Sequence, residues 1–114
     1  MIKRGEIYWV NLDPTVGSEI RKTRPALVVS NDQNNQFAET VTVLPITSQV
    51  TKLYPFEVLL KKEISGLKDD GKLKANQIRT VDKSRLSGKP AGLPLNERIM
   101  SEVARAVKIH LAIA

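Results

Sequence analysis

Three polar residues, Glu19, Arg24 and Thr47, carry side chains that together could cleave RNA. RNA needs neither a metal ion nor a protein nucleophile for cleavage, because its own 2′-hydroxyl can attack the adjacent phosphorus. A site of this kind needs a base for the 2′-hydroxyl proton, and the Glu19 carboxylate is a candidate. The Arg24 guanidinium can hold the non-bridging phosphate oxygens with two parallel donors. The Thr47 hydroxyl can donate a hydrogen bond to the same phosphate.

Other polar residues accompany these three. Ser18 precedes Glu19, and Ser48 follows Thr47 as a further hydroxyl donor. The remaining candidates for contact with RNA come later in the chain: Lys74, Asn76 and Gln77. If the strands that carry these residues form one twisted sheet, their ends and loops can converge on one edge of it.

The same residues also have ordinary structural interpretations. Glu19 and Arg21 can form a solvated ion pair that adds little stability. Arg24 can mark the start of a strand, and Thr47 with Ser48 can form the turn that follows one. Residue types alone therefore leave both interpretations open.

Three further side-chain groups are interpreted as structural. Arg79 and Asp82 can form an ion pair, and Trp9 with its neighbour Tyr8 is predicted to belong to the core or to a dimer surface rather than to a platform for stacking bases. His110 lies on a predicted apolar helix face and is expected to pack there. Because the chain has only this one histidine, a pair of histidines acting as base and acid is excluded.

Composition narrows the classes of function. The chain has 114 residues, no cysteine and a formal net charge of +6, with a sequence pI of about 9.8. One domain over residues 1–114 is expected, without disulfides, a zinc site or another cofactor. The excess of positive charge favours a polyanionic partner, with nucleic acid first and an acidic protein second.

The start of the chain does not resemble a signal peptide, because no apolar segment follows Lys3 and Arg4. The longest apolar stretches are too short to span a bilayer. We therefore expect a cytoplasmic protein with no membrane contact.

Short apolar and β-branched runs predict a β-rich fold. The expected strands are residues 6–12, 25–30, 40–46 and 56–60, with shorter ones near 73–76 and 77–81. Residues 13–23 lack any hydrophobic period and predict a long loop, and Asp70-Gly71 indicates a turn. Apolar residues at helical spacing then follow Asn96, a candidate N-cap. The pattern predicts a mainly β fold with a C-terminal helix, in the form of an SH3-like half-open β-barrel.

Sequence segments in the same order resemble the MazF/PemK toxin family. The matching segments are residues 4–10, 12–19, 23–30, 45–48 and 76–83. Gly17-Ser18-Glu19 and Thr23-Arg24-Pro25, followed by Thr47-Ser48, form a specific combination, whereas any one of them alone would be weak.

The resemblance implies the toxin of a type II toxin–antitoxin system, acting as a homodimer that cleaves single-stranded mRNA at specific sequences without a metal. The products would carry a 2′,3′-cyclic phosphate and a 5′-hydroxyl. By position, Arg24 and Thr47 match the main catalytic residues of the family and Glu19 matches an acidic residue beside them. The positions near bound RNA are Ser48, Lys74, Asn76 and Gln77. The partner would be a cognate antitoxin with an acidic, flexible segment.

One departure affects the mechanism. Some members of the family have an acidic residue where this chain has Asn76, and an amide cannot exchange a proton at neutral pH. Either Glu19 acts as the base, or Arg24 and the hydroxyl groups act through electrostatics alone. Two other functions remain as alternatives: a toxin of the same fold that binds DNA gyrase, and a nucleic-acid-binding barrel without activity. The chain ends Ala112-Ile113-Ala114 and lacks the Trp-Gly-Ile ending of the gyrase-binding toxins.

Overall fold

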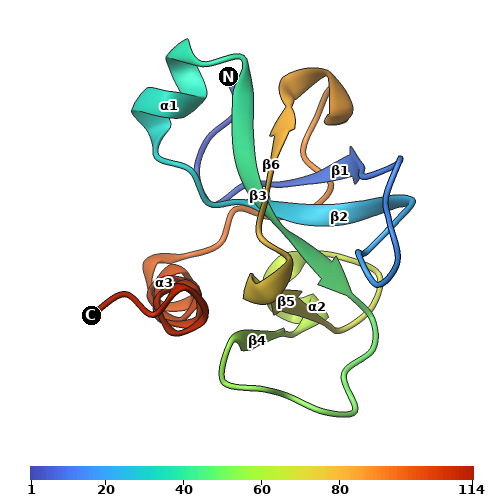
Figure 1. Cartoon of the computed structure of the whole chain (residues 1–114), viewed down its shortest axis with the longest axis vertical. Coiled ribbons are helices and arrows are strands. Elements are labelled where there is room, and N and C mark those ends of the chain that lie inside the picture. Colours follow the sequence, from blue (N-terminus) through green and yellow to red (C-terminus); the bar gives the residue numbers. More distant parts are fainter.

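The computed structural model describes all 114 residues and shows a bent antiparallel sheet with a long C-terminal helix beside it (Figure 1). Strands and helices alternate irregularly along the chain. In order they are β1 (Ile7–Asn11), β2 (Thr23–Val28), α1 (Asp32–Phe37), β3 (Thr40–Thr47), β4 (Glu57–Leu60), α2 (Lys62–Ser65), β5 (Gly71–Lys74), η1 (Ala75–Gln77), β6 (Arg79–Asp82), η2 (Lys83–Arg85) and α3 (Glu97–Leu111).

Strand β3 is the axis of the fold. The first half of β3 pairs with β6, and its last two residues pair with β5. Its middle pairs with β2, and Leu27 of β2 lies opposite Leu44 there. The strand order along the sheet is β1-β2-β3-β5-β4, and the two end strands, β1 and β4, do not pair with each other. The sheet therefore stays open, and the prediction of a mainly β, half-open barrel with a C-terminal helix is confirmed.

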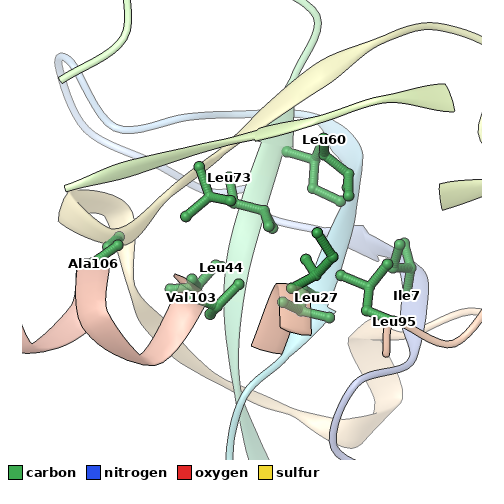
Figure 2. Packing of buried hydrophobic residues seen from close by; sticks show 12 residues of the cluster. Ile7, Leu27, Leu44, Leu60, Leu73, Leu95, Val103 and Ala106 are labelled. Atoms are coloured by element: carbon green, nitrogen blue, oxygen red, sulfur yellow. The ribbon is translucent and has the colours of Figure 1, made fainter. Parts of the chain in front are cut away.

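Alternation along the strands sends core residues to opposite faces of the sheet. Leu27 and Leu44 pack with Val103 of α3 in one cluster of buried residues, which Figure 2 shows. Their neighbours Ala26 and Val28 belong to a second buried cluster, because successive side chains of a strand point to opposite faces. The second half of β2, Ala26 to Val28, is apolar because both of its faces are buried, as expected for the central strand that its sequence predicted.

Helix α3 begins as predicted. The Asn96 side chain accepts a hydrogen bond from the Ile99 N–H at 3.0 Å, so Asn96 is the N-cap. Ile99 and Val103 are buried, whereas His110 near the other end is exposed, with its ring centroid 6.1 Å from that of Phe56. The prediction that His110 packs on the apolar face of the helix is therefore wrong: its side chain is exposed and only approaches an aromatic ring at the margin of the core. No helix has the length and apolar character needed to cross a membrane.

The region after β4 differs most from the sequence prediction. The predicted strands near 73–76 and 77–81 are instead β5 at Gly71–Lys74 and β6 at Arg79–Asp82, with the short helix η1 between them. Asp70-Gly71 does not form a hairpin turn, because Gly71 is already the first residue of β5. A Cβ atom on Gly71 would lie 2.7 Å from the Thr47 carbonyl oxygen, so glycine permits close approach of the two strands there.

Candidate active site

Arg24 and Thr47 lie on adjacent strands at the same edge of the sheet. The β2–β3 pairing ends at Ala26 and Pro45, and Arg24 and Thr47 each lie two residues beyond this last pair, at the same end of the two strands. Opposed residues of antiparallel strands point to the same face. The two side chains accordingly line one cleft with a volume of about 210 Å³.

We call this cleft the Arg24–Thr47 cleft. Segments from β1, β2, the end of β3 and the loop before β5 form it. Its lining residues are Trp9, Thr23, Arg24, Pro25, Ile46, Thr47, Ser48, Leu67, Lys68, Asp69, Asp70 and Gly71.

A second hollow, the Glu19 recess, adjoins the cleft and shares Arg24, Thr47 and Ser48 with it. The β1–β2 loop contributes most of its wall. It is lined by Gly17, Ser18, Glu19, Ile20, Arg21, Arg24, Thr47, Ser48 and Gln49. All three residues predicted to be catalytic therefore meet in one recess, together with Ser18 and Ser48.

Asn76 and Gln77 extend the same surface. They line a third hollow, which also contains Glu19, so the three hollows form a continuous path from the β5 side of the cleft to η1. Gln77 is partly used within the protein, because its Oε1 accepts a hydrogen bond from the Ile20 N–H at 3.2 Å. This contact fixes the β1–β2 loop against η1, while the exposed Asn76 side chain makes no hydrogen bond within the protein.

Lys74 lies elsewhere. Its Nζ is 3.5 Å from Oε2 of Glu57, whose side chain is fully buried, and it lines none of the three hollows. Lys72 forms the closer ion pair with the same carboxylate, at 3.0 Å. Of the residues predicted to contact RNA, Lys74 is thus the one that the fold does not bring together with the others.

The Arg24 side chain is oriented but not neutralised. Its Nε donates to the Arg21 carbonyl oxygen at 3.2 Å, and its terminal nitrogens have no hydrogen bond or ion pair. A guanidinium with both terminal nitrogens free can bind two oxygens of one phosphate. The Thr47 hydroxyl accepts the Gln49 N–H at 3.2 Å, which leaves its own proton to donate to a ligand.

Glu19 shapes the loop that carries it. Its Oε1 accepts the Val16 N–H at 2.6 Å, and its own N–H donates to the Val16 carbonyl oxygen at 3.2 Å. Glu19 makes no ion pair with Arg21, so the interpretation of these two residues as a surface ion pair is wrong for this structure. The second carboxylate oxygen has no partner and can accept a proton.

Arg79 and Asp82 do not form the predicted ion pair. They lie three residues apart on β6, which places their side chains on opposite faces of the strand. Arg79 instead donates to the Leu12 carbonyl oxygen at 2.6 Å, at the base of the β1–β2 loop. Hydrogen bonds from the Ser84 side chain and backbone lower the pKa of Asp82.

Of the two predicted positions for Trp9, the core is wrong and the dimer surface stays a prediction. The ring is 47% exposed and lines the Arg24–Thr47 cleft, so it does not belong to the core. The alternation of side chains along β1 indicates this position. Tyr8 and Val10 are both buried and belong to one cluster, so Trp9 between them points to the opposite face of the sheet. No group of three or more histidine, cysteine or acidic side chains has an arrangement that could hold a metal ion.

Comparison with known proteins identifies similar chains. Residues 3–111 match the family described as PemK-like, MazF-like toxin of type II toxin-antitoxin system. The chain is 43% identical to the endoribonuclease MazF9 of Mycobacterium tuberculosis, with 97% of each chain covered.

Two solved structures of MazF proteins have the same fold as this chain. MazF from Deinococcus radiodurans superposes with a TM-score of 0.80 at 28% identity, covering 97% of this chain and 96% of that one. MazF in a MazE–MazF complex from the same organism superposes with a TM-score of 0.74 at 26% identity, covering 99% and 98%. Both similarities extend over the strands and loops that form the three hollows.

Proposed function

The chain belongs to the PemK-like, MazF-like family of type II toxins and is an endoribonuclease, and on this premise we propose that its Arg24–Thr47 cleft cleaves single-stranded mRNA without a metal ion. The observation that carries the proposal is the meeting of Arg24, Thr47 and Glu19 in one recess. A protein that only binds nucleic acid has no need for a guanidinium, a hydroxyl and a carboxylate around one phosphate.

The reaction is an intramolecular transesterification. The 2′-oxygen attacks the adjacent phosphorus, the bond from phosphorus to the 5′-oxygen breaks, and the products are a 2′,3′-cyclic phosphate and a 5′-hydroxyl. The Glu19 carboxylate takes the proton of the 2′-hydroxyl, and a solvent water supplies the proton that the departing 5′-oxygen takes up. Arg24 and the hydroxyl of Thr47 stabilise the charge that develops on the non-bridging oxygens.

Glu19 is the proton acceptor in this proposal. Asn76 lines the neighbouring hollow but has no basic lone pair at neutral pH, so it supplies only hydrogen bonds. The Val16 N–H holds one oxygen of Glu19 and thereby orients the other. Ser18, Ser48 and Gln77 line the same path and would contact the RNA strand beside the cut.

The path formed by the three hollows would bind both the single-stranded RNA and the antitoxin. In-line attack requires a splayed backbone, which a single strand adopts more readily than a duplex. The MazE–MazF complex of the Deinococcus relative, together with the net charge of +6, supports an antitoxin whose acidic, flexible segment covers this path. The protein is further proposed to act as a homodimer and to be located in the cytoplasm.

The test of this proposal is cleavage of RNA in the presence of EDTA. The purified protein should cut a mixed single-stranded RNA at defined sites equally well with and without the chelator, and the fragments should end in 2′,3′-cyclic phosphate. The same sequences as a duplex should be cut far more slowly. Loss of activity in EDTA, restored by Mg²⁺, would contradict a metal-independent reaction.

A further inference from the structure

The loop before β5 brings a carboxylate, Asp69, to the Arg24–Thr47 cleft. The loop is fixed on the C-terminal side of this residue. Gly71 lies directly against the Thr47 backbone, and the next residue, Lys72, pairs with Thr47 in the sheet. The position of the loop is therefore coupled to the strand end that carries the Thr47 hydroxyl.

The neighbouring Asp70 has a structural role. Its Oδ1 accepts the Lys62 N–H at 2.9 Å, and its Oδ2 lies 3.7 Å from Nζ of Lys61. The backbone hydrogen bond from Lys62 and the charge of Lys61 lower the pKa of Asp70, so it stays ionised. Asp70 is thus fully used in tying the loop to α2.

Asp69 has no such role. Its side chain is exposed, makes no hydrogen bond or ion pair, and still lines the cleft. A free carboxylate beside a phosphate-binding site repels the negatively charged substrate. A favourable contact with another part of the RNA would offset this repulsion.

The cleft has room for one base next to the phosphate. Its volume of about 210 Å³ is smaller than that of pockets for drug-sized ligands, which measure about 300–1,000 Å³. Trp9 lines the cleft as a half-exposed residue, and an aromatic ring offers a face on which a base can stack. The cleft thus combines a stacking surface, a phosphate-binding guanidinium and a carboxylate.

We propose that Asp69 selects, beside the cleaved phosphate, a base that carries an exocyclic amino group and rejects uracil. The inference rests on the proposed function and names a specificity determinant of that same site. A carboxylate only accepts hydrogen bonds, so it pairs with the amino groups of cytosine, adenine and guanine. Uracil has an oxygen where cytosine has its amino group, and that oxygen repels a carboxylate placed to accept from the exocyclic group, although the N3–H of uracil lies one position further along the edge.

The experiment compares the wild-type protein with Asp69→Asn on RNA oligonucleotides in which cytosine is replaced by uracil, one position at a time. At one position next to the cut, the wild type should prefer cytosine about 5- to 150-fold, the range for a good base contact. An asparagine amide both donates and accepts. The variant should therefore cut both oligonucleotides within about threefold of each other.

A control variant and a binding measurement separate the inference from the proposed function. Glu63→Gln, an exposed residue of α2, removes the same charge outside the cleft and should keep the wild-type preference. Binding of oligonucleotides with 2′-deoxyribose at the cut measures the preference without cleavage. A base preference in binding without any cleavage would overturn the proposed function alone, whereas an unchanged preference in Asp69→Asn, or none in the wild type, would overturn the inference.

Discussion

Replacing Arg24 with alanine should lower the rate of RNA cleavage by about 10²–10³-fold, the usual loss when one donor to a developing oxyanion is removed. The terminal nitrogens of Arg24 make no contact within the protein, so they remain available for the substrate. Only the hydrogen bond from Nε to the Arg21 carbonyl oxygen is lost from the fold, at a cost of about 1 kcal/mol. Single-turnover cleavage of a defined RNA measures the effect.

Two control variants separate geometry from charge. Arg24→Lys keeps the positive charge but loses the paired donors, so it should recover only part of the activity. Arg105→Ala on α3 removes one positive charge from an exposed position outside the three hollows and should cut RNA at close to the wild-type rate. Equal activity of Arg24→Ala and the wild type would remove Arg24 from the catalytic site.

Replacing Glu57 with glutamine should lower the free energy of unfolding by about 3–5 kcal/mol, because it leaves a buried ammonium without its counter-charge. The Glu57 side chain is 0% exposed and that of Lys72 is 7% exposed, with Oε1 and Nζ 3.0 Å apart. Glu57 also accepts the Tyr54 N–H at 2.9 Å, and Lys72 donates to the Lys52 carbonyl oxygen at 2.6 Å. The pair thereby joins β4 and β5 to the loop that follows Thr47.

Urea denaturation with a matched control and a double variant measures this effect. Glu102→Gln on the exposed face of α3 should change stability by no more than about 0.5 kcal/mol. Glu57→Leu combined with Lys72→Met should recover much of the loss, since apolar residues can replace a buried ion pair. A change for Glu57→Gln as small as that for Glu102→Gln would contradict the importance of this pair.

The same carboxylate also predicts an acid dependence. Burial alone would raise the pKa of Glu57, but the hydrogen bond from Tyr54 and the ammonium of Lys72 lower it below its ordinary value. Its contribution to stability is therefore complete above the unfolded-state pKa of about 4.3 and is lost as the pH falls through the lower folded-state pKa. The difference in stability between the wild type and Glu57→Gln should shrink over that acidic range.

Local sequence signals predicted β1, β2, β3, β4 and α3 because each of those elements has a clear run or period of apolar residues. The start of β5 was missed because Gly71 is required by a contact with the Thr47 backbone, which lies far away in the sequence. An Asp-Gly pair looks the same in a hairpin turn and at a close strand crossing. Only the pairing of β3 with β5 distinguishes the two.

The candidate site could be predicted in part. Arg24, Thr47 and Glu19 stand out because their residue types fit one reaction and their segments match a family pattern. Lys74 has a suitable charge, but its ammonium lies beside the buried Glu57, which is 17 residues earlier in the chain and not visible as a partner from local sequence. Asp69 reaches the cleft through the packing of a loop, which hydrophobic periodicity does not describe. The position of Trp9 follows instead from strand alternation, because its neighbours Tyr8 and Val10 are both buried.

The most direct test of the account is cleavage of an RNA oligonucleotide with a single 2′-deoxyribose on the 5′ side of the cut, in EDTA. This substitution should abolish cleavage at that bond, because the attacking hydroxyl is missing, while deoxyribose at other positions should have little effect. The intact strand should still bind, with an affinity that falls in Arg24→Ala. Cleavage of the deoxy-substituted bond at the normal rate would contradict attack by the 2′-hydroxyl and the role assigned to the Arg24–Thr47 cleft.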